Sequence, residues 1–429
     1  MKTILNPDIT EWQSLFARPA LDVQDLNTLV QQVFTEVLQS GDKAVTKYTQ
    51  LFDGVTPDSL AVSQQEIDAA TATISDELKA AIQLAKGNIE KFHSAQIDEK
   101  QIIETTTGVT CWRESRAIEK VGIYIPGGSA PLFSTVLMLA VPATMAGCKE
   151  IILCTPPDKQ GNINPAILYT AQLSGVSKIY KVGGIQAIGA MAFGTESITK
   201  VDKIFGPGNQ YVTAAKQAAF VAGVAIDLPA GPSELLVIAD ATANPAFVAA
   251  DLLSQAEHGA DSQVVLLTTD ADFANATIAE INEQLVVLPR FVIAQKALVN
   301  SKIIVLKDTL DCIAFSNGYA PEHLIIATGD ADTLAEKVTN AGSVFIGKYS
   351  CESAGDYASG TNHTLPTNGY ARSYSGVSLD SFVKKITFQK ISAQGLKNIG
   401  PAIEAMAAAE QLQAHKNAVT IRLKSLQDV

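Results

Sequence analysis

The feature that most constrains the fold of this chain is a regular alternation of short apolar runs with helical segments. Between residues 120 and 240 the apolar runs are Val121–Ile125, Ile151–Cys154, Ile179–Val182, Ile204–Phe205, Ala225–Leu228 and Leu235–Ile238. The helical segments between them are Ser129–Gly147, Asn164–Leu173, Ile185–Phe193 and Gln210–Val221. Strands and helices repeated at this spacing are typical of βαβ units, so the pattern predicts a parallel sheet.

A second alternating set follows and predicts a second parallel sheet in an α/β core. Its apolar runs are Val264–Leu267, Ile303–Leu306, Leu324–Ala327 and Val344–Ile346. Before the first set, Ser63–Gln96 carries one apolar stripe at helical spacing, which predicts a long helix with His93 on its polar, solvent-facing side. After Ser378 the tail is mostly helical, with a strand-like run at Ile386–Ile391 and a helix over Ala393–Gln411.

Composition narrows the class of partner and the compartment. The 429 residues include 32 Lys and Arg against 44 Asp and Glu, a formal net charge of −12. This balance disfavours nucleic acid and membranes as partners, because their phosphates would repel the protein. The most apolar stretch, Val136–Ala146, is interrupted by Pro142 and falls short of the ~20 residues that a membrane span needs. The N-terminus lacks the apolar run of a signal peptide, so we expect a cytoplasmic protein with reduced, mostly buried cysteines.

Several strands of the first set end in tight turns rich in glycine and proline. These turns are Pro126-Gly127-Gly128, Gly183-Gly184, Gly206-Pro207-Gly208-Asn209 and Ala230-Gly231-Pro232-Ser233. Ligands of open parallel sheets bind beyond the carboxyl ends of the strands, where glycine lets backbone N–H groups approach a phosphate. Four such turns favour a nucleotide-sized ligand, although each turn alone could simply end a strand. No G-x-G-x-x-G motif follows the first strand.

A set of polar residues in the second half has the chemistry of a metal site. Gln255 and His258 share a face at the end of a predicted helix over Asn244–His258. Asp356 lies in a polar loop that continues to His363, and His415 follows in the helical tail. Two imidazoles, a carboxylate and an amide oxygen would suit zinc, but the spacing matches no local zinc motif, and a histidine that caps a helix remains an alternative.

Glu322 and His323 precede the apolar run Leu324–Ala327. At a junction between loop and strand, both side chains can reach one pocket, where a carboxylate beside an imidazole could act as a general base pair. On local evidence alone, a surface glutamate and a capping histidine explain the pair equally well.

Together these segments resemble the histidinol dehydrogenase family, and the resemblance covers about residues 20–425. The stretches that carry it are Tyr124–Gly128, Gly206–Asn209, Ala225–Glu234, Asp251–His258, Pro321–His323, Ser353–His363 and His415–Thr420.

The resemblance implies an NAD-linked oxidation of L-histidinol to L-histidine through L-histidinaldehyde. It implies zinc held by Gln255, His258, Asp356 and His415, with the metal fixing the substrate. His323 would be the general base for the alcohol, and Glu322 would activate the water that attacks the aldehyde. The other substrate contacts would be Ser233, His363 and Glu410, and the NAD contacts would be Tyr124, Gln186 and Asn209.

The resemblance also implies an α/β fold with two incomplete Rossmann-like domains, and a homodimer in which the tail brings Glu410 and His415 into the partner's site. The implied division is an N-terminal segment 1–21, a large domain of 22–123 and 234–373, an inserted NAD-side domain 124–233 and a dimerisation domain 374–429.

Three other functions remain open on the residues alone. Aldehyde oxidation through a thiolate would need a reactive cysteine, for which Cys111 and Cys148 are the candidates. A zinc hydrolase would use Glu322 to activate metal-bound water, but it would leave the glycine turns without a role. A non-catalytic nucleotide-binding protein on the same fold would not need Glu322 and His323.

Overall fold

The computed structural model describes residues 1–18, 24–127, 130–228 and 231–427; Gly128 and Ala230 of the predicted turns lie outside this part of the chain. The chain divides into two compact units, Met1–Ala95 with Ile118–Phe382, and Gln96–Ala117 with Val383–Val429. Each unit is described separately below.

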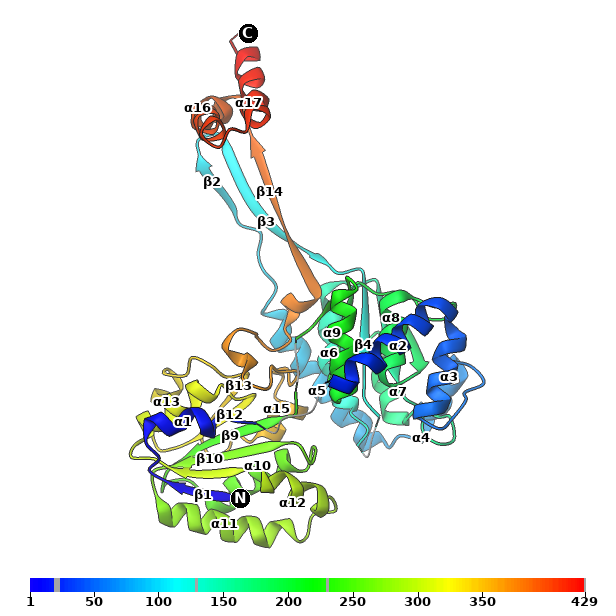
Figure 1. Cartoon of the computed structure of the whole chain (residues 1–429), viewed down its shortest axis with the longest axis vertical. Coiled ribbons are helices and arrows are strands. Elements are labelled where there is room, and N and C mark those ends of the chain that lie inside the picture. The colour runs from blue at the N-terminus through cyan, green and yellow to red at the C-terminus, as the bar shows by residue number, and fades with distance from the viewer. Residues whose placement is uncertain (19–23, 128–129, 229–230, 428–429) are drawn as a thin grey trace. The chain divides into compact units, whose positions relative to one another are not determined.

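The first sheet of the larger unit is fully parallel and has the strand order β6-β5-β4-β7-β8 (Figure 1). Its strands are β4 (Lys120–Tyr124), β5 (Glu150–Thr155), β6 (Lys178–Lys181), β7 (Lys203–Phe205) and β8 (Ala225–Ile226). The connecting helices are α6 (Phe133–Ala146), α7 (Pro165–Leu173), α8 (Gly184–Phe193) and α9 (Gln210–Val221). The strand order reverses between β4 and β7, which is where doubly wound sheets bind nucleotides.

The second sheet is also parallel and has the order β1-β11-β10-β9-β12-β13. Its strands are β1 (Lys2–Leu5), β9 (Glu234–Ala239), β10 (Gln263–Thr268), β11 (Lys302–Val305), β12 (His323–Ala327) and β13 (Ser343–Ile346). Without β1, this order repeats that of the first sheet. The predicted run Leu235–Ile238 therefore begins the second sheet rather than ending the first, and the sequence did not predict β1 as an edge strand.

Both sheets are buried on both faces, which explains why their strands read as continuous apolar runs. In β5, Ile152 and Cys154 face one apolar cluster, which includes residues of α8 and α9. Ile151 and Leu153 face another cluster, which includes residues of α6 and α7. The helices α6 and α7 thus cover one face of the first sheet, and α8 and α9 cover the other.

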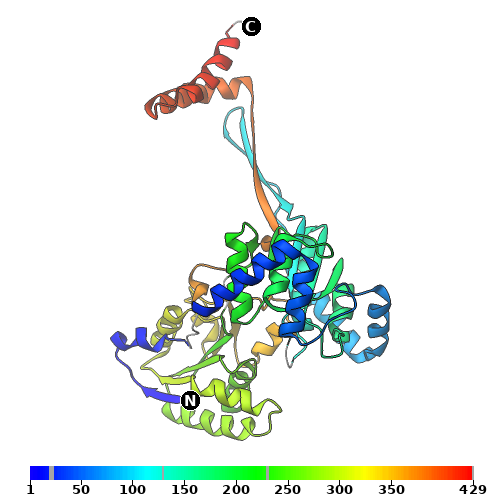
Figure 2. The ribbon, with the colours of Figure 1, turned by 45° about the vertical axis from the view of Figure 1, so that its right-hand side comes forward.

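Four further helices pack against the helices that cover this first sheet: α2 (Gln24–Ser40), α3 (Asp42–Phe52), α4 (Gln64–Thr73) and α5 (Asp76–Ser94). Figure 2 shows the blue α2 and α3 lying against the green helices of the sheet, and α5 packs on α6. The predicted domain division instead groups residues 22–123 with 234–373, and that division stays a prediction.

The long helix predicted over Ser63–Gln96 is interrupted. Ile74 has extended backbone and Ser75 caps α5, so the apolar stripe continues across two helices. The prediction that His93 faces solvent is wrong, because His93 is fully buried and its Nδ1 lies 2.9 Å from the carbonyl oxygen of Ile89.

The other helices described in this unit precede, connect or follow the strands of the second sheet in the chain. They are η1 (Ile9–Glu11), α1 (Trp12–Leu15), α10 (Pro245–Ala256), α11 (Ala271–Leu285), α12 (Phe291–Val299), α13 (Thr309–Tyr319), α14 (Ala331–Ala335), α15 (Glu352–Tyr357), η2 (Tyr370–Arg372) and η3 (Leu379–Phe382). Over the described ranges, no helix is both long and apolar enough to cross a membrane.

The smaller unit is an antiparallel sheet with two helices. Its strands β2 (Ile102–Thr106), β3 (Val109–Ala117) and β14 (Val383–Ile391) have the order β14-β3-β2, followed by the paired helices α16 (Ala393–Ala409) and α17 (Gln413–Ser425). The predicted strand and helix of the tail are present. Few of the unit's described side chains are buried, whereas Ile102, Ile103, Met406 and Ile421 are exposed.

Candidate active site

Glu322 and His323 lie at the amino end of β12, an inner strand of the second sheet between β9 and the edge strand β13. α13 ends at Tyr319, and Ala320 in left-handed backbone turns the chain into Pro321 and the strand. His323 is in register with Leu235 of β9, so both side chains lie beside the start of β9. Glu322 Oε2 is 3.7 Å from His323 Nδ1.

The surroundings of His323 decide which ring nitrogen carries its proton. Nδ1 lies 3.3 Å from the backbone carbonyl oxygen of Glu234. A carbonyl can only accept, so Nδ1 donates and the neutral ring keeps its lone pair on Nε2. Nε2 is buried, lies 3.9 Å from Asp356 Oδ1, and makes no hydrogen bond within the described part of the chain. His323 therefore presents an unshared lone pair toward Asp356.

Burial keeps His323 neutral. Desolvation lowers its pKa to about 4, against the opposing effects of the Asp356 carboxylate and the Glu234 carbonyl. The same cause raises the pKa of Glu322 well above its usual value, although the backbone N–H of Glu234 donates to Glu322 Oε2 at 2.9 Å. The pair thus combines a neutral imidazole with a carboxyl group that holds its proton more tightly than an exposed glutamate does.

Asp356 and His363 come from α15 and the loop that follows it. His363 Nδ1 donates to the backbone oxygen of Asp356 at 2.9 Å, and its Nε2 lies 3.1 Å from Thr135 Oγ1 of α6. The Asp356 carboxylate lies 3.6 Å from His363 Nδ1 and 3.9 Å from His258 Nε2. One carboxylate therefore links three histidines from three separate segments.

The end of α10 supplies Gln255 and His258. Asn244 caps the start of this helix, as its sequence predicts, and His258 follows directly after the C-cap residue Glu257. The side chain of His258 is 45 % exposed. Gln255 is fully buried, yet neither its amide oxygen nor its amide nitrogen has a hydrogen-bond partner among the residues described. A buried amide without partners is costly unless a ligand satisfies it.

His258 and Asp356 fit a divalent metal, and Glu352 joins them. One ligand atom from each of the three lies within 4.8 Å of the other two. Glu352 is buried; its Oε2 accepts from Ser254 Oγ at 3.2 Å, and its Oε1 lies 3.7 Å from His323 Nδ1. Desolvation and the nearby Asp356 carboxylate raise the pKa of Glu352 well above its usual value. A cation here would relieve the crowding of buried carboxylates and use the unpartnered oxygen of Gln255.

Sequence reasoning missed Glu352. The signal was present, because Glu352 lies four residues before Asp356, and residues four apart share one face of a helix. We expected a loop at this position, and a loop does not carry that spacing rule.

The predicted NAD contacts lie at the carboxyl ends of the first sheet. The Tyr124 hydroxyl at the end of β4 accepts from the backbone N–H of Gly184 at 3.1 Å. Gln186, in the first turn of α8, lies 3.5 Å from an Asp53 carboxylate oxygen through its Nε2. Asn209 caps α9 by accepting from the backbone N–H groups of Tyr211 and Val212. Tyr124 is the last residue of β4 and Asn209 follows β7, and these are the strands between which the sheet order reverses.

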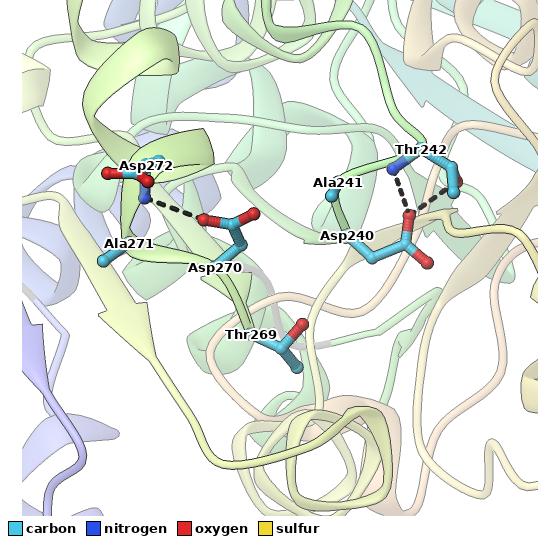
Figure 3. A pocket seen from close by; sticks show the side chains of 7 residues that line it. All are labelled: Asp240, Ala241, Thr242, Thr269, Asp270, Ala271 and Asp272. Atoms are coloured by element: carbon cyan, nitrogen blue, oxygen red, sulfur yellow. Dashed lines mark hydrogen bonds between the residues drawn. The ribbon is translucent and has the colours of Figure 1, made fainter.

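The corresponding edge of the second sheet is acidic. Figure 3 shows the pocket beyond β9 and β10, which is lined by Asp240, Ala241, Thr242, Thr269, Asp270, Ala271 and Asp272. Asp240 accepts from the backbone N–H and the hydroxyl of Thr242, and Asp270 caps α11. Carboxylates at this edge would repel a dinucleotide's phosphates, so the first sheet is the better coenzyme platform.

The family model for histidinol dehydrogenase matches residues 16–423. The chain belongs to the histidinol dehydrogenase family. It is 62 % identical to the histidinol dehydrogenase of Bacteroides thetaiotaomicron, over 99 % of this chain and all of that protein. It is 53 % identical to that of Pectobacterium atrosepticum, over 98 % of this chain and 95 % of that protein.

A solved structure supports the same assignment. The crystal structure of histidinol dehydrogenase from Elizabethkingia anophelis has a TM-score of 0.98 and 65 % identity, and covers all of this chain and 99 % of that one. The chain is therefore a dehydrogenase with the predicted α/β fold.

The remaining predicted residues are divided between the two units. Ser233 directly precedes β9, and its backbone oxygen accepts from the N–H of Gln263 at 3.2 Å. Glu410 caps the end of α16, and His415 lies in the first turn of α17, so both belong to the smaller unit. The roles of these three residues stay predictions.

Proposed function

We propose that this dehydrogenase oxidises L-histidinol to L-histidine through L-histidinaldehyde in histidine biosynthesis, and that it reduces two NAD⁺ in succession. The main support for the proposal is the state of His323. Its imidazole is buried and neutral, and the lone pair on its Nε2 faces Asp356. A base of this kind, beside candidate metal ligands and in a family of dehydrogenases, suits the removal of a proton from a bound alcohol.

Zinc is the metal we propose for the site. Its ligands would be Gln255, His258 and Asp356, with His415 of the partner subunit, and Glu352 is a neighbouring carboxylate. Zinc would hold the substrate's imidazole and amine in place without changing its own oxidation state. The unpartnered amide of Gln255 and the approach of His258 to Asp356 support this ligand set.

In the first oxidation, His323 Nε2 takes the proton of the substrate's hydroxyl group. A hydride leaves the carbon that bears this hydroxyl group and goes to NAD⁺. The products are the aldehyde, NADH and one proton held on the imidazole. The Glu234 carbonyl, which accepts from Nδ1, would stabilise the imidazolium that forms.

In the second oxidation, the Glu322 carboxylate takes a proton from water as the water oxygen adds to the aldehyde carbon. The hydrate then loses a second hydride to another NAD⁺ and leaves as the carboxylic acid. The raised pKa of Glu322 supports this role, because a general base works best when its pKa approaches the working pH.

Substrate and coenzyme contacts complete the proposal. Ser233, His363 and Glu410 of the partner subunit would bind the substrate, and Tyr124, Gln186 and Asn209 would contact NAD. The enzyme would be a cytoplasmic homodimer with shared sites. The many exposed apolar side chains of the smaller unit support an oligomer, since a small unit rarely builds a sufficient core alone.

The experiment that tests the proposal counts NADH formed per L-histidinol consumed, with zinc present and after chelation. We expect two NADH per substrate, loss of activity on chelation and recovery with added zinc. One NADH would contradict the role of Glu322. No NADH at all, with zinc bound, would favour a hydrolase or a non-catalytic nucleotide-binding protein.

A further inference from the structure

Asp53 is an acidic residue at the coenzyme end of the first sheet to which the proposed reaction gives no role. α3 ends at Phe52, and the backbone N–H of Asp53 bonds the carbonyl of Thr49. Gly54 continues the turn in left-handed backbone, and Lys159 Nζ donates to the backbone oxygen of Asp53 at 2.9 Å. The helix end and Lys159 therefore fix the position of this backbone.

The Asp53 carboxylate faces the predicted NAD contacts. Its Oδ2 is 3.5 Å from Nε2 of Gln186, a long hydrogen bond, and Gln186 is fully buried. The Gln186 Oε1 has no hydrogen-bond partner in the ranges that the structure describes. Partial burial raises the pKa of Asp53, which fits a carboxylate that lacks close donors. The unpartnered amide oxygen of Gln186 and the Asp53 carboxylate, which has only this one long hydrogen bond to a donor among the described residues, together form a site for a ligand with hydroxyl groups.

The two faces of the sheet indicate which half of the dinucleotide reaches Asp53. His363 contacts Thr135 on α6, so the reaction site borders the face that α6 covers. Gln186 lies on α8 and Asp53 at the end of α3, and these helices pack together on the opposite face. With the nicotinamide at the reaction site, the adenosine half extends toward α3 and α8.

We propose that Asp53 accepts hydrogen bonds from the adenosine ribose hydroxyls and selects NAD over NADP, an inference that rests on the proposed function. A carboxylate at this place binds a 2′-hydroxyl and repels a 2′-phosphate, as acidic residues do in other dinucleotide folds. Lys159 is the nearby cation that would attract the 2′-phosphate once the carboxylate is neutralised.

The test compares kcat and KM for NAD⁺ and NADP⁺ in the wild type and in Asp53→Asn, at saturating L-histidinol. We expect the kcat/KM ratio of NAD⁺ to NADP⁺ to fall by about tenfold or more, mainly through the KM values, as for a hydrogen bond to a charged group. Adding Lys159→Gln to Asp53→Asn should remove the gain with NADP⁺. Asp58→Asn is the matched control, because Asp58 is an exposed aspartate in the same loop, and its ratio should not change.

Competitive inhibition by ADP-ribose and 2′-phospho-ADP-ribose gives a readout that does not depend on hydride transfer. The wild type should favour ADP-ribose, and Asp53→Asn should lose that preference. An unchanged preference in a variant that still oxidises L-histidinol with NAD⁺ would overturn the role of Asp53 alone. A wild type that reduces neither coenzyme would instead overturn the proposed function.

Discussion

The carbonyl of Glu234 fixes the tautomer of His323 and leaves Nε2 as the only ring nitrogen able to take a proton. We predict that His323→Gln lowers kcat with L-histidinol by about 10²- to 10⁴-fold, the usual contribution of a general base. The amide of Gln can still donate to the Glu234 carbonyl but is no base, so KM should change little. Steady-state kinetics provide the measurement. A variant whose KM rises while its kcat stays unchanged would contradict the assignment.

Glu322 has a different role from His323 in the proposed mechanism, and its replacement should separate the two oxidations. In Glu322→Gln, we expect the NADH yield per L-histidinol to fall from two toward one, because the amide cannot take a proton from water. Supplying L-histidinaldehyde directly should give little NADH. The prediction is wrong if the variant loses both oxidations equally while its unfolding transition matches that of the wild type.

His93 should make the protein less stable in acid. Burial lowers the pKa of His93 in the folded chain below the ordinary 6.5. At a pH between the folded-state pKa and 6.5, the unfolded chain therefore binds a proton that the folded chain does not. The free energy of unfolding therefore falls as the pH drops from 7.5 to 5. We predict a smaller fall for His93→Asn, measured by urea unfolding at both pH values. His323 and His363, whose pKa values are also lowered, should keep part of the dependence of unfolding free energy on pH in this variant. If His93→Asn leaves that dependence unchanged, the prediction is contradicted.

At the level of elements, α5 supports the loop between Asp356 and His363. Asn88 Nδ2 donates to the Ala358 carbonyl at 2.8 Å. Gly360 has a φ of +107°, and a Cβ there would lie 2.7 Å from the Asn88 carbonyl oxygen. The loop that positions the candidate metal ligand therefore follows the surface of α5 closely.

We predict that Gly360→Ala destabilises the protein by about 1–3 kcal/mol and weakens zinc binding, because the loop must move away from α5. Gly87→Ala is the control on the same helix. Gly87 is exposed and a Cβ there meets nothing within 4 Å, so alanine should stabilise by about 0.5–1 kcal/mol. Thermal unfolding and zinc titration measure both effects, and equal behaviour of the two variants would contradict the close fit of the loop.

How much the sequence predicts depends on how an element is buried. The inner strands of both large sheets are buried on two faces, so their apolar runs locate them well, whereas the edge strand β1 is mostly exposed and was missed. β2 is exposed throughout, β3 has a single buried residue, and both carry polar residues, so no apolar run indicates them. His93 was misplaced although it lies four residues after the buried Ile89, which puts both on one helix face.

The candidate site was predictable where its residues are neighbours in sequence, as Glu322 and His323 are. What the sequence alone could not supply is the pairing of β9 with β12. This pairing sets Glu234 against Glu322 and His323 across a separation of nearly ninety residues. Such contacts follow from strand order, which local patterns do not determine.

In the whole molecule, the two large sheets share a core strand order, but different side chains lie at the carboxyl ends of their strands. The carboxyl edge of the first sheet presents an amide, a phenol and glycine turns, whereas that of the second presents the aspartates of Figure 3. The candidate catalytic pair lies at the amino end of the second sheet. A shared topology therefore leaves the chemistry to the residues at each strand end.

The smaller unit raises the question of where Glu410 and His415 act. In the proposed homodimer, both residues would be delivered into the other subunit's site, and the exposed apolar residues of this unit are what supports that proposal. Two inactive variants can test this arrangement. In a heterodimer of His415→Ala and His323→Ala chains, one site combines an intact His323 with an intact His415 of the partner subunit, and the other site lacks both.

Random pairing at equal concentrations makes half the dimers mixed, and half the sites in those are complete, so we predict recovery of about a quarter of wild-type activity. The measurement unfolds and refolds the two variants together and compares NADH formation with each variant refolded alone. Mixing His323→Ala with His258→Ala is the control, because both changes fall in the larger unit of the same site and leave no complete site. Recovery confined to the first mixture supports shared sites. No recovery in a mixture that has formed heterodimers would place His415 in the site of its own chain.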